Sequence, residues 1–109
     1  MIAAHPLNVQ IWVATTPIDM RKSFDSLAEV VRSFLGRDPL SGNLFVFRNR
    51  GGQLLKILWW DQQGLAIFYK RLERAAFRWP RANETAVEIT SAQLLRLLSG
   101  LEVAERCAS

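Results

Sequence analysis

The residues best suited to chemistry in this chain are basic side chains concentrated between positions 48 and 81. This window holds eight lysines and arginines against two acidic residues, a net charge of +6, whereas the remainder carries more acids than bases. The basic residues are Arg48, Arg50, Lys56, Lys70, Arg71, Arg74, Arg78 and Arg81. Cations gathered in this way suit a phosphate backbone or an acidic protein, and the ordinary alternative is a solvated basic rim.

Two aromatic residues in the same window add to this pattern. Trp60 and Tyr69 can stack on unpaired bases if they are exposed, and the loop 48–52 combines two guanidinium groups with glycines that allow another backbone to approach. We therefore predict that the eight basic residues and these two aromatics bind nucleic acid or a protein partner. No helix-turn-helix spacing is present, so a major-groove reader is not expected.

Catalytic, metal and cofactor chemistry is not predicted. Acidic-triad metal catalysis needs three carboxylates converging on metal ions, but the acidic residues here fall at a helix cap, on a helix surface, in turns and among arginines. The only histidine is His5, so Ser23 and Ser26 have no second histidine to activate them. The only cysteine, Cys107, permits neither an internal disulfide nor a zinc cluster. We expect a protein that is not an enzyme.

Length and composition indicate one small domain. The chain has 109 residues, of which 50% are hydrophobic and 22% charged, a globular composition with an ordered core expected over about residues 9–101. No apolar run is long enough to span a bilayer, and residues 1–10 show no secretory signal. We expect a cytoplasmic protein with no membrane partner.

The elements that position these residues follow from hydrophobic periodicity. Val9–Ala14 is predicted to be a strand, and Thr16, Pro17 and Asp19 to start a helix that ends at Gly36. Its apolar stripe consists of Met20, Phe24, Leu27, Ala28, Val31, Phe34 and Leu35. After a turn at residues 38–42, three β-rich runs at 44–48, 54–60 and 65–71 predict an antiparallel meander. Residues 77–80 and 86–90 can extend this sheet, and a capping box at 90–93 predicts a second helix that closes the fold near residue 100.

The meander has two apolar faces in this prediction. If Arg48 pairs with Gln53 and Trp60 with Leu65, alternation separates two sets of side chains. One face holds Leu44, Val46, Leu55, Ile57, Trp59 and Phe68, and the other holds Phe45, Phe47, Leu54, Leu58, Trp60 and Ile67 with Lys56, Tyr69 and Arg71. Either each helix covers one face, or both cover the same face and leave a platform of aromatics among bases. The fold class is therefore α+β, an antiparallel β-meander packed with two amphipathic helices.

Four strings in the chain carry a family resemblance: DMRKSFDSL at 19–27, DPLSGNLFVFRNRGG at 38–52, LLKILWWDQQGLAIFYKRLERAAFRWP at 54–80 and ITSAQL at 89–94. Over about Val9 to Leu101 the chain resembles the TnpB accessory family, the second open reading frame of insertion sequences of the sixty-six class. Ser23 and Ser26 stand where that family often has glycine, and Leu101-Glu102-Val103 follows where an aromatic is common.

The resemblance implies a protein that is encoded beside a longer transposase and assists transposition. It names no catalytic residue. The expected partners are DNA, at transposon ends or without sequence preference, the cognate transposase, the other accessory protein of the element, and a second copy of the chain. Two hypotheses remain: a DNA-binding accessory factor, or an adaptor that docks onto the transposase or onto itself.

Overall fold

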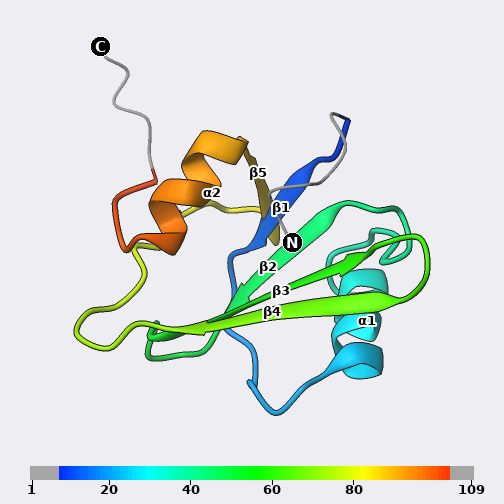
Figure 1. Ribbon diagram of the computed structural model, residues 1–109, viewed down its shortest axis with the longest axis horizontal. Helices are drawn as coiled ribbons and strands as arrows, with labels where there is room; N and C mark the ends of the chain where they lie inside the picture. Colours follow the sequence, from blue (N-terminus) through cyan, green and yellow to red (C-terminus); the bar gives the residue numbers. More distant parts are fainter. Residues whose placement is uncertain (1–7, 104–109) are drawn as a thin grey trace.

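The computed structural model describes residues 8–103, which form five strands and two helices (Figure 1). In chain order these are β1 (Ile11–Ala14), α1 (Phe24–Ser33), β2 (Leu44–Arg48), β3 (Leu54–Trp60), β4 (Leu65–Arg71), β5 (Ala86–Ile89) and α2 (Ser91–Leu98). His5 and Cys107 lie outside the described residues. Neither described helix is long and apolar enough to cross a membrane. The predicted α+β class is confirmed.

The strands form one sheet in the order β4-β3-β2-β1-β5. β2, β3 and β4 are antiparallel neighbours, which confirms the predicted meander. β1 pairs with β2 in parallel, and β5 pairs antiparallel with β1 at the edge opposite β4. The connection between β4 and β5, residues 72–85, therefore crosses from one edge of the sheet to the other (Figure 1).

The strand register agrees with the prediction in one hairpin and differs in the other. Trp60 pairs with Leu65 as predicted, but Arg48 pairs with Leu55 rather than with Gln53. The Asn49 carboxamide oxygen accepts hydrogen bonds from the loop backbone and fixes this longer turn. A shift of two residues leaves each side chain on its original face, so the predicted division of the two faces holds.

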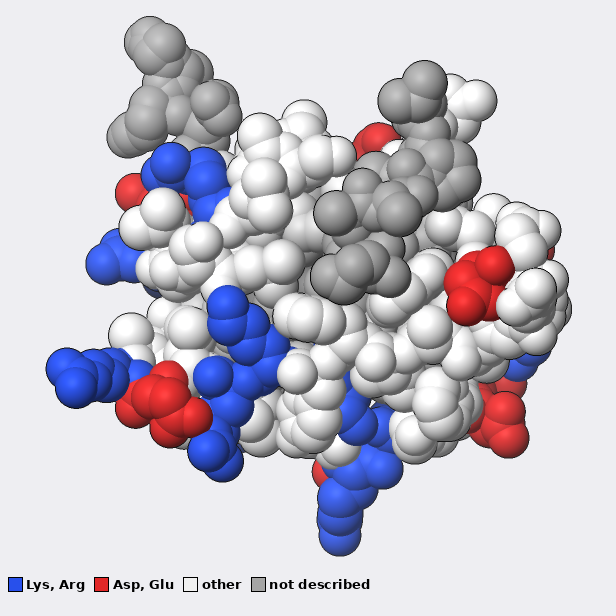
Figure 2. Space-filling view, viewed as in Figure 1, with Lys and Arg blue, Asp and Glu red and all other residues white. Residues whose placement is uncertain are grey.

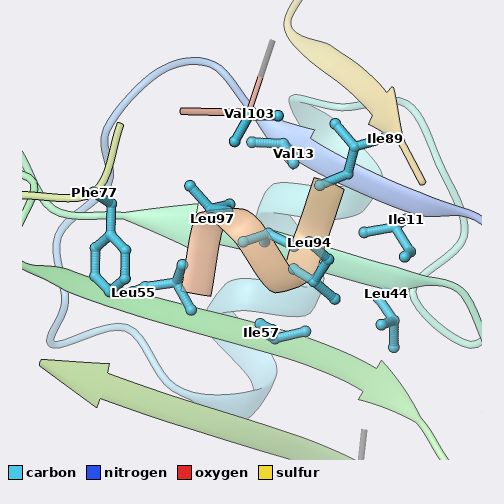
Figure 3. Packing of buried hydrophobic residues seen from close by; sticks show 11 residues of the cluster. Ile11, Val13, Leu44, Leu55, Ile57, Phe77, Ile89, Leu94, Leu97 and Val103 are labelled. Atoms are coloured by element: carbon cyan, nitrogen blue, oxygen red, sulfur yellow. The ribbon is translucent and has the colours of Figure 1, made fainter. Parts of the chain in front are cut away.

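Each face of the sheet is covered by one helix. Figure 3 shows Leu94 and Leu97 of α2 facing the sheet residues Leu55 and Ile57. On the other face α1 contributes the buried residues Leu27, Ala28 and Val31, which pack with Phe45, Phe47 and Leu58. The first of the two predicted arrangements is therefore the observed one, and the second face is not an open platform.

The first helix begins later than predicted, because Thr16 does not cap it. Asp19, expected to reach back to that cap, instead accepts hydrogen bonds from the backbone and guanidinium of Arg21. The helix starts where the Ser26 hydroxyl accepts a hydrogen bond from the backbone N–H of Ser23 at 2.9 Å. Residues 15–23 consequently form an irregular connection.

The shorter helix buries less of the predicted apolar stripe. Leu27 and Val31 are fully buried, but Phe24 is 47% and Phe34 is 49% exposed. Phe24 is the first residue of α1 and Phe34 is its C-cap. The prediction that these two phenylalanines belong to the core was therefore wrong, because they stand at the ends of the helix rather than along its inner face.

The C-terminal part matches the prediction except at residues 77–80, which do not extend the sheet. The Phe77 side chain enters the core on the α2 face, and its backbone N–H donates to the carbonyl of Gly52 at 2.7 Å, outside any strand ladder. The capping box of α2 forms as predicted. Gln93 donates its backbone N–H to the Thr90 hydroxyl at 3.1 Å, and its side chain accepts from the Thr90 backbone at 2.8 Å.

Candidate nucleic-acid interface

One end of the sheet collects most of the predicted basic residues. The register places Leu54 beside Arg71 and Arg48 beside Leu55, so β2 and β4 end where β3 begins. β1 ends there too because it runs parallel to β2, and β5 begins there because it is antiparallel to β1. We call this the basic end of the sheet and define it by Arg48, Arg50, Arg71, Arg74, Arg78 and Arg81.

The hairpin 49–53 and the connection 72–85 pack against each other at the basic end. The backbone N–H of Phe77 donates to Gly52, as described above. Gly52 has a φ of +81°, and a Cβ at this position would lie 3.3 Å from the Cβ of Ala76. Glycine permits both the conformation and the close approach. Arg50 on the hairpin and Arg74 on the connection are thus carried by neighbouring segments.

Among residues 8–103, one arginine of the basic end forms an ion pair. Arg71 forms an ion pair with Glu73, with 3.0 Å between Nε and Oε2. Within residues 8–103 none of the other five arginines forms an ion pair. Arg50, Arg74, Arg78 and Arg81 are exposed. Figure 2 shows lysines and arginines, with acidic residues among them, over the left part of the molecule, where the end of β4 and the β4–β5 connection lie. The cations at the bottom of the same view lie over the connection between β1 and α1 and are not part of the basic end.

Arg48 lies deeper than the other arginines of the basic end. Its Nη2 donates to the backbone carbonyl of Thr15 at 3.3 Å, and its guanidinium carbon lies 5.6 Å from the centre of the Trp79 ring. Burial, and secondarily the nearby charge of Arg50, lower the pKa of Arg48 from its ordinary value. The guanidinium is thus a partly desolvated cation between two loops.

Two of the predicted basic residues are engaged inside the fold. Lys56 is only 7% exposed, and its Nζ donates to the carbonyls of Met20 at 2.8 Å and Lys22 at 2.7 Å. The Nζ of Lys70 donates to the carbonyl of Leu98 at 2.7 Å, where a cation stabilises the end of α2. In contrast to the expectation from sequence, Lys56 does not lie on a surface that a partner can reach.

The two predicted aromatic residues lie at different distances from the basic end. Tyr69 is 53% exposed, and its ring centre lies 4.7 Å from the Nζ of Lys56. Trp60 pairs with Leu65 at the far end of β3. Since a strand rises about 3.3 Å per residue, Trp60 lies roughly 20 Å from the basic end. Tyr69 therefore lies beside the basic end, whereas Trp60 lies at the opposite end of the sheet.

The sequence prediction missed Trp79 and the cavity beside it. This cavity has a volume of about 550 Å³ and is lined by Thr15, Thr16, Arg48 and residues 79–85. A smaller cavity of about 390 Å³ lies against residues 78–81, Glu102 and Val103. The sequence did carry one indication of this residue, because Trp79 lies between Arg78 and Arg81 in the basic window. Among residues 8–103 no three His, Cys, Asp or Glu side chains are grouped to hold a metal ion.

Comparisons with known proteins agree with the resemblance seen in the sequence. The family model described as IS66 Orf2 like protein matches residues 9–108. Two Sinorhizobium fredii proteins are similar over 95 residues, which is 87% of this chain. The protein y4hO is 53% identical with 83% of its length covered, and the protein y4jC is 33% identical with 81% covered. No solved structure matches. The chain belongs to the IS66 Orf2-like family, the accessory proteins of IS66-class insertion sequences.

Proposed function

We propose that this protein is a non-catalytic accessory factor that binds DNA through the basic end of the sheet during transposition. One observation carries the proposal: exposed arginines from two neighbouring segments project from one end of the fold without ion pairs to the described acidic residues. Cations that are not neutralised by nearby acids remain available to phosphates. A DNA-bound role of this kind belongs to the cytoplasm of a bacterial cell.

The expected binding is electrostatic and independent of base sequence. The arginines of the basic end lie at the ends of β2 and β4, on the hairpin loop and on the irregular connection, and none of them lies on a helix that could enter the major groove. Each phosphate contact releases condensed counterions, so affinity falls as salt rises. The protein should therefore bind transposon-end and random duplexes with similar affinity at low salt.

Fluorescence anisotropy with both duplexes over a salt series tests this proposal. Arg74→Gln removes one exposed charge from the basic end, and Arg32→Gln is the matched control on α1. Arg74→Gln should weaken binding of both duplexes and lower the slope against log salt by about 1, while Arg32→Gln leaves both quantities unchanged. Failure of the wild-type protein to bind either duplex at low salt contradicts the proposal, as does an equal effect of both variants.

A second candidate function is that of an adaptor for the separately encoded transposase, the other accessory protein or a second copy of the chain. It is favoured by large apolar side chains that remain exposed, namely Phe24 at 47%, Phe34 at 49% and Leu95 at 66%. An acidic partner can also use the arginines of the basic end. Co-purification with the transposase that is lost in Phe24→Ser or Leu95→Ser, but retained in Arg74→Gln, supports the adaptor and separates it from DNA binding.

A further inference from the structure

The larger cavity at the basic end is too big for a single ion. Its volume of about 550 Å³ falls within the range in which protein pockets hold small organic molecules. It lies between the end of β1 and the segment 79–85, with Arg48 on the β2 side. A ligand of this cavity can therefore include more than a phosphate group.

The lining combines cationic, aromatic and hydrogen-bonding groups. Arg48 and Arg81 supply guanidinium groups, and Trp79 supplies an indole ring. Hydroxyl and carboxamide groups complete the lining, from Thr15, Thr16 and Asn83. A phosphate that carries an aromatic base matches this set, because guanidinium binds phosphate and an indole stacks on a base. A purely apolar ligand does not match it.

Several hydrogen bonds hold the walls of the cavity in place. The Nε1 of Trp79 donates to the carbonyl of Ala14 at 2.6 Å, which fixes the ring to the end of β1. The Thr15 hydroxyl donates to the backbone carbonyl of Glu84 at 2.7 Å, and the Thr15 backbone N–H donates to Thr85 at 3.0 Å. Both ends of the segment 79–85 are thus hydrogen-bonded to the end of β1 and the residue that follows it. A preformed site of this kind loses little entropy on binding.

Arg48 contributes a positive charge to the cavity and forms no ion pair within the described part of the chain. Its Nε is buried and finds no hydrogen-bond partner among residues 8–103, and the guanidinium forms no ion pair there. A partly buried cation without a counter-charge is costly, and a bound anion relieves that cost. Glu84 also lines the cavity and would repel such an anion.

We propose that this cavity binds one nucleotide of an unpaired DNA strand, with its phosphate near Arg48 and Arg81 and its base against Trp79. This inference rests on the proposed DNA binding and deepens it, because it names a discrete site and a preference for unpaired DNA. A base that is stacked and paired within a duplex cannot enter a cavity of this kind without leaving the stack.

The first test is a titration of the full-length ¹⁵N-labelled protein with thymidine 5′-monophosphate, followed by NMR. The Trp79 indole N–H, identified by its loss in Trp79→Phe, and the backbone amides of Thr16 and Asn83 should shift together. Thymidine and inorganic phosphate, added separately, should bind at least about tenfold more weakly, since each lacks one of the two recognised groups. If inorganic phosphate binds as well as the nucleotide, or if none of these signals moves, the inference is wrong.

The second test compares variants with an oligothymidylate and with a duplex. Arg48→Gln and Arg81→Gln should each weaken oligothymidylate binding about tenfold or more, and Arg32→Gln should leave it unchanged. Glu84→Gln should strengthen it. Arg48→Gln removes a partly buried group and can prevent folding. In that case the result for the exposed Arg81→Gln decides the test.

The two tests separate this inference from the proposed function. If duplex DNA binds through Arg74 but the oligothymidylate is insensitive to Arg81→Gln, the nucleotide site is overturned and DNA binding stands. If the nucleotide shifts the cavity signals while duplexes fail to bind at low salt, the site stands and the broader DNA-binding surface is overturned.

Discussion

The indole Nε1 of Trp79 donates a hydrogen bond to the backbone carbonyl of Ala14, 2.6 Å away, although 65 residues separate them in the sequence. This bond attaches the β4–β5 connection to the end of β1. The connection spans the width of the sheet and has no regular secondary structure between β4 and β5. Its conformation therefore depends on a few such attachments, and so does the placement of the arginines that it carries.

Trp79→Phe should lower the free energy of unfolding by about 1 kcal/mol, the usual net value of one hydrogen bond, since phenylalanine keeps an aromatic ring but removes the donor. Urea denaturation followed by circular dichroism measures this change. Trp60→Phe is the control, because it replaces another half-buried indole at the opposite end of the sheet. A Trp79→Phe protein that is no less stable than wild type would show that the bond to Ala14 does not anchor the connection.

Lys56→Met should lower the free energy of unfolding by about 1 to 3 kcal/mol, since the carbonyls of Met20 and Lys22 lose a charged donor in a buried setting. Thermal or urea unfolding measures the loss. The affinity for DNA should stay at the wild-type value while the variant is folded, because the ammonium does not face solvent. An unchanged stability together with weaker DNA binding would show that Lys56 contacts DNA rather than stabilising the fold.

Asp19 should titrate well below the ordinary range of an aspartate. The side-chain hydrogen bond from Arg21, followed by its backbone hydrogen bond, lowers the pKa of Asp19 from 3.8 to about 2. Because the folded pKa is the lower one, the stabilisation from this pair is complete above pH 3.8 and is lost as the pH falls toward 2. Carboxyl ¹³C shifts measured against pH report the midpoint. In Arg21→Gln the pKa of Asp19 should rise toward its ordinary value, and an unchanged midpoint would contradict the pairing.

The sequence predicted the elements that depend on local pattern. Strict alternation defined both faces of the meander, and the Thr90 to Gln93 spacing defined the start of α2. The predicted start of α1 was wrong because Asp19 had two possible partners, the cap at Thr16 and the side chain and backbone of Arg21. In the structure Asp19 accepts its hydrogen bonds from Arg21. Local spacing alone does not rank such competitors.

The candidate site was predictable in charge but not in arrangement. A window of basic residues identifies the arginines, but the register decides which of them share one end of the sheet. Lys56 was included because it belongs to the basic window, on a sheet face that also holds Tyr69. Nothing in the local sequence reveals that Met20 and Lys22 turn their carbonyls toward it. Trp79 was missed for a related reason, since its partners lie on β1 and β2, far away in the sequence.

The contact between the hairpin 49–53 and the β4–β5 connection can be tested with a matched pair of glycine substitutions. Gly52→Ala should destabilise the fold by about 1 to 3 kcal/mol, because a side chain is strained at its positive φ and also meets Ala76. Gly64→Ala, in the opposite hairpin, should have little effect, since its added Cβ meets open space.

Urea denaturation of the two variants gives the comparison directly. Because the strain at Gly52 acts where the hairpin touches the connection, Gly52→Ala should also weaken DNA binding more than Gly64→Ala at equal folded fraction. Equal stabilities of the two variants would mean that the hairpin and the connection are not held in contact. The basic end would then be two independent loops, and the charges of Arg50 and Arg74 would not act on one ligand.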